Sequence, residues 1–215
     1  KKMLFQEGIK LPIVTTLHGT DITLVGSHPF YKTAVTFSIN SSDAVTSVSQ
    51  SLKDDTQRLF KIKKDITVIP NFVDLNKYKS VGNQCPKGIL AKDTERIITH
   101  ISNFRVVKRI PDVIHIFNNI RKEIPSKLLM IGEGPERENA EKLCIDLNIE
   151  NHVLFLGNSN EVNKILCFSD LFLLPSETES FGLSALEAMA SGLPVLSVEN
   201  VGIKDFAKNN ENIFI

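Results

Sequence analysis

Two glutamates, Glu179 and Glu187, stand on either side of a Phe-Gly pair in the segment SETESFGLSALEAMASG. An ionised carboxylate only accepts hydrogen bonds, so each of these side chains suits the hydroxyl groups of a sugar. Gly182 lies between them and lets an anion approach the backbone closely. A phosphate flanked on both sides by sugar hydroxyl groups describes a nucleotide sugar. The simpler interpretation is an acidic loop beside an amphipathic helix, with Glu187 solvated.

A strand, a loop, a helix and a second strand are expected to position these residues. The apolar residues 171–174 predict a buried strand that Pro175 ends. Apolar residues at helical spacing after Gly182 predict a helix, and the Gly-Leu-Pro sequence at 192–194 predicts its end. Such a crossover puts the loop at the carboxyl end of a parallel sheet. The first N–H groups of the helix, near Leu183, have no partner within the helix and favour a phosphate.

The sequence ETESFGLSALEAMASGLPV resembles the Glu-x7-Glu motif of retaining, GT-B-fold glycosyltransferases of the glycogen-synthase-like and sucrose-synthase-like family. The resemblance implies an α/β protein with two Rossmann-like, doubly wound parallel-sheet domains that face a cleft. It also implies that Glu187 binds the donor ribose and that Glu179 binds the hexose hydroxyl groups. The neighbouring residues that it implies in substrate binding are Ser180, Phe181, Gly182 and Leu183.

Basic residues in the segment SNFRVVKR, residues 102–109, could supply the positive charge that the glutamates cannot. Fixed cations stabilise the negative charge that develops on a departing diphosphate. A cluster of this kind is also typical of a solvated helix start. The resemblance places Lys108 on the family's phosphate-binding lysine, whereas Asn103 falls where an arginine is expected. We therefore predict Arg105 as the second cation.

A His-Gly-Thr sequence, His18 to Thr20, follows a predicted β-branched strand, which is where an α/β protein places chemistry. A simple turn is the alternative. The resemblance implies that His18 contacts the transferred sugar or its phosphate. The residues predicted to act in catalysis are then His18, Arg105, Lys108 and Glu179. Further substrate-binding residues are predicted at strand ends, namely Gly19, Thr20, Asn103, Gly132, Gly134 and Asn158, although for Gly132 and Gly134 an ordinary strand-to-helix turn is the alternative.

The composition argues against several classes of protein. The chain has 215 residues, 42% of them hydrophobic, with 25 basic and 25 acidic residues. Zero net charge gives no electrostatic reason to expect nucleic acid or an anionic membrane as partner. No apolar run approaches the roughly 20 residues that a membrane-spanning helix needs. Neither clustered His or Cys residues nor an Asp-x-Asp sequence points to a metal, and no cofactor is expected beside the donor substrate.

Three cysteines, Cys85, Cys144 and Cys167, are scattered without CxxC spacing. That pattern favours reduced, mostly buried thiols in the cytoplasm over disulfides or a metal site. His100 and His115 fall on an apolar strand and helix and are interpreted as structural.

Alternating strands and helices predict two domains. Residues 96–198 predict five strands alternating with four helices, which is a doubly wound parallel sheet. Residues 1–73 contain only three predicted strands and two helices, and the resemblance implies the later part of an N-terminal, acceptor-side domain. Residues 74–94 lose periodicity and predict a linker. Residues 95–215 then form the domain that binds the nucleotide-sugar donor, and the resemblance implies that it is truncated at its end.

Three other segments, HGTDIT at 18–23, PNFVD at 70–74 and HISNFRVVKR at 100–109, occur together with the Glu-x7-Glu segment. This set is most similar to family members that start bacillithiol biosynthesis by moving N-acetylglucosamine from UDP-N-acetylglucosamine (UDP-GlcNAc) to the hydroxyl of L-malate. The resemblance implies a retaining transfer in which the departing phosphate takes the acceptor's proton. The expected partners are therefore a nucleotide sugar and a hydroxy acid, without nucleic acid or membrane, and homo-oligomer formation is left open.

Three alternatives to this function stay open. They are a transferase with a different acceptor, a UDP-sugar 2-epimerase and a non-catalytic nucleotide-sugar-binding protein.

Overall fold

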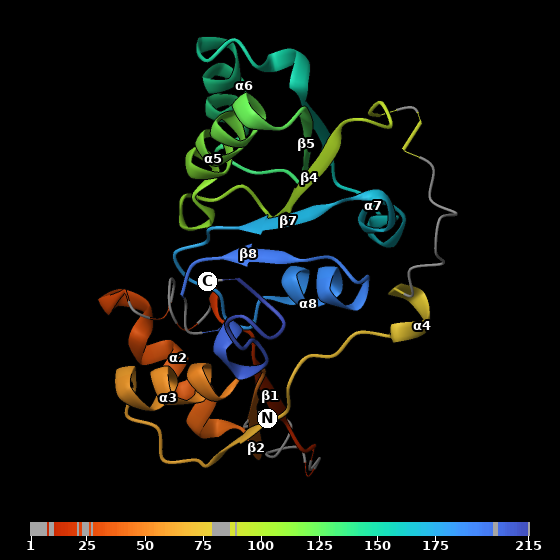
Figure 1. Ribbon diagram of the computed structural model, residues 1–215. Coiled ribbons are helices and arrows are strands. Elements are labelled where there is room, and N and C mark those ends of the chain that lie inside the picture. Colours follow the sequence, from red (N-terminus) through yellow and green to blue (C-terminus); the bar gives the residue numbers. More distant parts are fainter. Residues whose placement is uncertain are drawn as a thin grey trace. The chain divides into compact units, whose positions relative to one another are not determined.

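The computed structural model describes residues 8, 11–20, 22, 26, 28–78, 87–88, 90–199 and 202–214 (Figure 1). The chain divides into two compact units. The first unit contains Lys1–Asn71 together with two later segments, Glu179–Phe181 and Val201–Asp205. The second unit contains Phe72–Thr178, Gly182–Asn200 and Phe206–Ile215.

The first unit is built on a parallel sheet with the strand order β1-β2-β3. Its described elements are β1 (Val14–Leu17), α2 (Pro29–Ser41), β2 (Ala44–Ser47), α3 (Gln50–Leu59) and β3 (Ile66–Val68). The predicted three strands and two helices are thus confirmed. Ser49 caps α3, as its place before the helix predicts, because its side chain accepts a hydrogen bond from the N–H of Leu52.

The second unit is a five-stranded parallel sheet with four longer helices. These elements are β4 (Arg96–Ile101), α5 (Ile110–Glu123), β5 (Ser126–Ile131), α6 (Arg137–Asp146), β6 (Val153–Gly157), α7 (Val162–Phe168), β7 (Leu171–Leu174), α8 (Leu183–Ala190) and β8 (Val195–Ser197). The strand order is β6-β5-β4-β7-β8, so the chain builds outward from β4 in one direction and then from β7 in the other. The predicted doubly wound sheet is therefore confirmed, and its topological switch point lies between β4 and β7.

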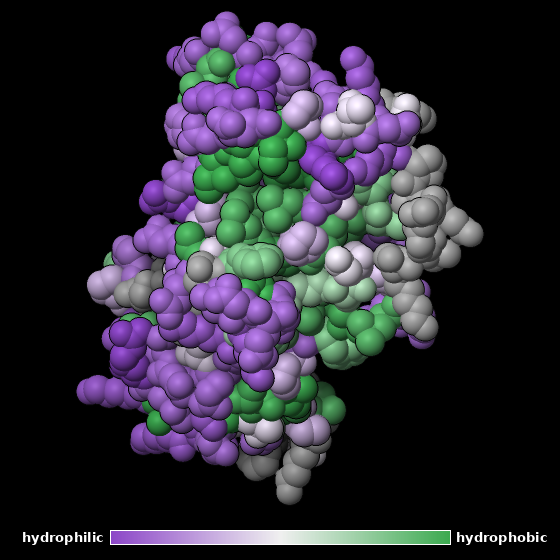
Figure 2. All heavy atoms as spheres, viewed as in Figure 1, coloured by the Kyte–Doolittle hydropathy of each residue, from purple (hydrophilic) through white to green (hydrophobic). Residues whose placement is uncertain are grey.

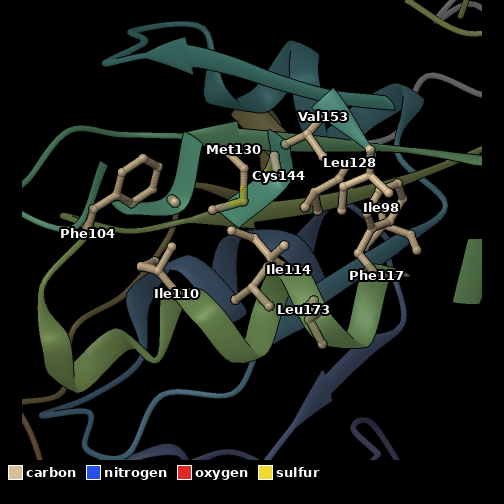
Figure 3. Close-up of a cluster of buried hydrophobic side chains, with 13 residues drawn as sticks. Ile98, Phe104, Ile110, Ile114, Phe117, Leu128, Met130, Cys144, Val153 and Leu173 are labelled. Carbon is tan, nitrogen blue, oxygen red and sulfur yellow. The ribbon is translucent and has the colours of Figure 1, made fainter. Parts of the chain in front are cut away.

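Both faces of the second sheet are buried. Leu128 and Met130 of β5 join a core against α5 and α6, whereas Leu129 and Ile131 of the same strand join a core that includes residues of α7. Figure 1 shows α5 and α6 on one side of this sheet and α7 on the other. Figure 3 shows the larger core, where side chains of α5 point toward those of the strands. Burial on both sides of β5 explains why its residues 128–131 are continuously hydrophobic.

Helix α5, which covers one face of this sheet, is amphipathic. Val113, Ile114 and Phe117 of α5 are completely buried, and the outer surface of α5 and α6 is mainly hydrophilic (Figure 2). This pattern is what an apolar stripe on a surface helix produces.

A short helix, α4 (Leu75–Tyr78), lies within the residues 74–94 that the sequence predicts as a linker. It belongs to the second unit and contacts α7 and α8. Residues 79–86 and 89 of the predicted linker lie outside the described residues.

The prediction for the cysteines is wrong at one position. Cys167 is disulfide-bonded, whereas Cys144 is a free and buried thiol. Cys85 lies outside the described residues. Spacing in the sequence misses a disulfide of this kind, because the bond depends on the distance between two Cα atoms in the fold and not on their separation along the chain. Burial raises the pKa of the Cys144 thiol to about 11, with nearby Glu141 acting in the same direction.

Candidate functional site

The switch point of the second unit brings together two loops that the sequence singles out. One of them, residues 102–109, follows β4 and is called the basic loop. The other follows β7 from Pro175 onward. The N–H of Glu177 donates a hydrogen bond to the carbonyl of Val107, with 2.9 Å between N and O, and thereby joins the two loops. Ligands of doubly wound proteins bind outside the strand ends at such a point, so the basic loop lies where an anionic ligand would be held.

Lys108 ends a short 3-10 helix, Val106–Lys108, that Arg105 precedes. Arg105 is exposed and Lys108 is half-buried. Arg109 follows in the left-handed conformation, with φ 54°, and begins the turn into α5. Asn103 is exposed on the same loop. The two predicted cations and Asn103 therefore lie on one turn at the carboxyl end of β4.

His100, on β4, is completely buried and orders this basic loop. Its Nδ1 lies 2.9 Å from the carbonyl oxygen of Leu173, and its Nε2 lies 2.8 Å from the hydroxyl of Ser102. A carbonyl only accepts, so Nδ1 carries the hydrogen and Nε2 of the neutral ring accepts from Ser102. The Ser102 hydroxyl oxygen in turn accepts from the N–H of Phe104. This chain of hydrogen bonds joins β7 and β4 to the start of the basic loop.

We expect His100 to make the protein less stable in acid. Burial, together with the nearby charge of Lys108, lowers the pKa of His100 from 6.5 to about 4. As the pH falls below 6.5, His100 is therefore protonated in the unfolded chain but stays neutral in the folded protein. Stability should fall by about 3 kcal/mol between pH ~6.5 and ~4 and should then level off with respect to this group.

Urea denaturation between pH 4.5 and pH 7 measures this effect, with His100→Asn as the comparison. The variant should lose most of the pH dependence that His100 contributes. His152, whose pKa is also lowered by burial, remains in both proteins and contributes equally. An identical slope in the two proteins would show that His100 does not carry the effect.

The loop from Gly132 to Pro135, called the glycine loop below, packs directly against the basic loop. Gly132 has φ +121°, and a Cβ atom there would lie 1.8 Å from the carbonyl oxygen of Ser102. A Cβ atom at Gly134 would lie 2.1 Å from the carbonyl oxygen of Asn103. The N–H of Glu136 also donates to the carbonyl of Phe104, at 2.9 Å. Both glycines therefore permit close contact between two loops, which goes beyond an ordinary strand-to-helix turn.

Asn158 follows the end of β6 and is exposed. The N–H of Gly132 donates to the carbonyl of Gly157, at 2.8 Å, so the end of β6 adjoins the glycine loop. The guanidinium of Arg137 pairs with Glu133 and lies over the ring of Phe155, 5.7 Å from its centroid. Gly132, Gly134 and Asn158 thus lie at neighbouring strand ends, as predicted from their positions in the sequence.

Helix α8 begins with Gly182 in the left-handed conformation, at φ 84°, and no side chain caps it. The first helical hydrogen bonds run from Ala185 and Leu186 to the carbonyl of Gly182. The N–H groups of Leu183 and Ser184 precede these bonds and lie at the positive end of the helix dipole. The predicted anion site at this helix start therefore has the expected backbone geometry.

Glu187 is half-buried in the second turn of α8. Its Oε1 accepts a hydrogen bond from the hydroxyl of Tyr78, with 2.7 Å between the two oxygens. Sequence reasoning missed Tyr78, because it lies in the segment interpreted as a linker. No motif marks a contact between residues so far apart in the chain.

The remaining predicted residues lie in the first unit. His18 and Thr20 are exposed just after β1, and Gly19 between them is buried with φ +128°. A Cβ atom at Gly19 would lie 1.6 Å from the hydroxyl of Ser180. The carbonyl of Ser180 also accepts a hydrogen bond from the hydroxyl of Ser49, at 2.6 Å. Asp21 and Thr23 of the HGTDIT segment lie outside the described residues.

The loop residues Glu179 to Phe181 pack within this first unit. The carbonyl oxygen of Glu179 lies 2.0 Å from where a Cβ atom of Gly202 would be, and Phe181 is buried. His18, Gly19, Thr20, Glu179, Ser180 and Phe181 therefore belong to one unit, and the other predicted site residues belong to the second. The assignment of these residues to substrate binding stays a prediction.

Neither a metal cluster nor a membrane-spanning helix is present in the part of the chain that the structure describes. No group of three or more His, Cys, Asp or Glu side chains there could hold a metal ion. None of its helices is both long and apolar enough to cross a bilayer.

Two glycosyltransferase families match the chain. The family of glycosyl transferases group 1 matches residues 84–215, and glycosyltransferase family 4 matches residues 4–77. N-acetyl-alpha-D-glucosaminyl L-malate synthase of Bacillus anthracis is 44% identical over 97% of the chain and 55% of its own length. The 2-deoxystreptamine N-acetyl-D-glucosaminyltransferase of Niallia circulans is 26% identical over 99% of the chain and 58% of its own length. The chain thus spans little more than half the length of these relatives.

Solved structures show the same fold. Anabaena HepE in complex with UDP and glucose has a TM-score of 0.84 at 20% identity and covers 94% of the chain, which covers 57% of HepE. A TarM variant of S. aureus, in complex with Fondaparinux, alpha-GlcNAc-glycerol and UDP, has a TM-score of 0.74 at 25% identity. It covers 94% of the chain, and the chain covers 40% of TarM. The predicted GT-B class is confirmed by these similarities together with the two parallel sheets.

Proposed function

Because the chain belongs to the glycosyl transferases group 1 family, we propose that the full-length protein transfers N-acetylglucosamine from UDP-GlcNAc to the hydroxyl of L-malate. The observation that carries this proposal is the 44% identity, over nearly the whole chain, to an enzyme named for the same product. The reaction would be the first step of bacillithiol biosynthesis, as the sequence motifs imply. A retaining transfer in the cytoplasm, without metal or cofactor, is part of the same proposal.

The second unit supports the donor half of the proposal. A diphosphate carries charge that Lys108, Arg105 and the start of α8 can offset at the switch point. Arg can grip phosphate oxygens with two parallel N–H bonds, whereas Lys acts as a point charge. In this proposal Glu187 accepts hydrogen bonds from the ribose, and the loops at Gly132, Gly134 and Asn158 adjoin the uracil.

In this proposal, side chains of the first unit contact the transferred sugar. His18 is exposed at the end of β1, where the proposal has it contact the sugar or its phosphate. Glu179 would accept hydrogen bonds from the hexose hydroxyl groups. Malate is a dianion at neutral pH, so its binding needs cations, and the proposal leaves those residues to the rest of the full-length protein.

The test is product formation by the full-length protein from UDP-GlcNAc with L-malate, with other 2-hydroxy acids and with no acceptor. Malate-dependent release of UDP, together with a glycosylated malate identified by mass, is the expected result. UDP release with another acceptor would support a transferase activity but contradict malate as the acceptor. A changed sugar configuration without any acceptor would identify an epimerase, and UDP binding without turnover would identify a binding protein.

A further inference from the structure

The hydroxyl of Tyr78 is held against the carboxylate of Glu187 by the packing of α4. Tyr78 is only 6% exposed, and its oxygen lies 2.7 Å from Oε1 of Glu187. Helix α4 contacts both α7 and α8, and the carbonyl of Lys77 accepts a hydrogen bond from Asn163 on α7, at 3.3 Å. Tyr78, near the start of the second unit, is therefore fixed beside Glu187, which lies 109 positions later in the chain.

The direction of this hydrogen bond is determined by the chemistry of the two groups. An ionised carboxylate has no hydrogen to donate, so the phenol donates. Burial, and then the hydrogen bond and charge of Glu187, raise the pKa of Tyr78 far above neutral pH, so the phenol keeps its hydrogen. Hydrogen bonds to charged acceptors are shorter and stronger than those between neutral groups.

The contact leaves one carboxylate oxygen for a ligand. Among the residues that the structure describes, only Tyr78 donates a hydrogen bond to the carboxylate of Glu187, and it uses Oε1. Two rotatable bonds separate this carboxylate from Cβ, so an unheld Glu187 would sample several rotamers. A bond that fixes Oε1 also fixes the direction of Oε2, and a fixed acceptor loses less entropy when a hydroxyl group binds to it.

We propose that Tyr78 is a positioning residue for nucleotide recognition, which orients the carboxylate of Glu187 so that Oε2 accepts a hydrogen bond from a ribose hydroxyl. This inference rests on the proposed function, because it takes Glu187 as the residue that binds the ribose. Tyr78 itself acts through Glu187 and need not touch the nucleotide.

The test compares two ligands, UDP and 2′,3′-dideoxy-UDP, by calorimetric titration of the full-length protein. Tyr78→Phe keeps the ring and removes only the hydroxyl, and it should raise the Kd for UDP about tenfold. The dideoxy nucleotide has no ribose hydroxyl for Oε2, so its Kd should change by less than about twofold. Tyr31→Phe, at an exposed tyrosine of α2, is the matched control and should change neither Kd.

Two further measurements separate positioning from a general structural role. In a double-mutant cycle, Tyr78→Phe should add little to the effect of Glu187→Ala on UDP binding, because the two residues act as a pair. In turnover, Tyr78→Phe should raise the KM for UDP-GlcNAc about tenfold and change kcat by less than about threefold.

Each contrary result has a definite meaning. If Tyr78→Phe raised the Kd for UDP and the Kd for dideoxy-UDP equally, the inference would be overturned and Tyr78 would have a structural role. An unchanged Kd for UDP in that variant would also overturn it. If the folded wild-type protein did not bind UDP at all, the proposed function would fail, and the inference that rests on it would fail with it.

Discussion

Replacing Lys108 with alanine is expected to lower kcat/KM for the proposed donor, UDP-GlcNAc, by about two orders of magnitude. Loss of one fixed group that stabilises developing charge typically costs 10²- to 10³-fold in rate, so about 100-fold is the lower end of that range. Lys108 is half-buried at the switch point, where its surroundings screen its charge less than bulk water would. The effect should therefore exceed that of removing an exposed surface charge.

A binding measurement locates the effect on the diphosphate. Lys108→Ala should weaken the binding of UDP much more than the binding of uridine, because uridine has no phosphate for the ammonium group to contact. Lys108→Arg, which keeps the charge, should retain more activity than the alanine variant. Lys122→Ala, in the last turn of α5, removes a cation that interacts with Asn119 on the same helix and should leave both affinities unchanged. Unchanged kcat/KM in Lys108→Ala would remove this residue from the phosphate site.

Replacing Gly132 with alanine is expected to destabilise the second unit by about 3 kcal/mol or more. The substitution combines two costs, because φ is +121° and the new Cβ would overlap the carbonyl oxygen of Ser102. Left-handed strain costs about 1–3 kcal/mol, and overpacking typically adds a similar amount. The overlapping atom belongs to the backbone, so no rotation of a side chain can relieve the contact.

Gly192 provides a matched control for this prediction. It also has a positive φ, +78°, but a Cβ atom there would meet no atom within 4 Å. Gly192→Ala should therefore cost only about 1 kcal/mol, the strain of the left-handed backbone alone. Urea denaturation of the two variants measures the difference. A similar loss in the free energy of unfolding in both variants would show that the contact between the glycine loop and the basic loop does not contribute to stability.

Local patterns in the sequence determined most of the secondary structure. The strand at 171–174 was predicted with the bounds that the structure has. The end of α8 just before Gly192 was also predicted correctly, because the signals that end a helix act within one helical turn. Alternation of strands and helices was enough to predict a doubly wound sheet, since parallel strands need crossover connections.

Strand order then explains the part of the site that sequence reasoning could predict. The motifs after β4 and β7 were each recognisable alone, but their contact through Val107 and Glu177 follows from β4 and β7 being neighbours. A doubly wound order makes the first and fourth strands adjacent. The sequence alone is therefore enough to expect the basic loop and the Glu-x7-Glu loop at one end of the sheet.

Contacts between distant residues were decided only by the tertiary structure. Nothing near Tyr78 in the sequence indicates that its hydroxyl meets Glu187, and nothing near Gly132 indicates that Ser102 lies against it. The disulfide at Cys167, which the spacing of the cysteines argued against, belongs to the same class. The physical reason is range: propensity, periodicity and capping act within a few residues, whereas these contacts depend on which side chains and loops the packed sheet brings within a few ångströms.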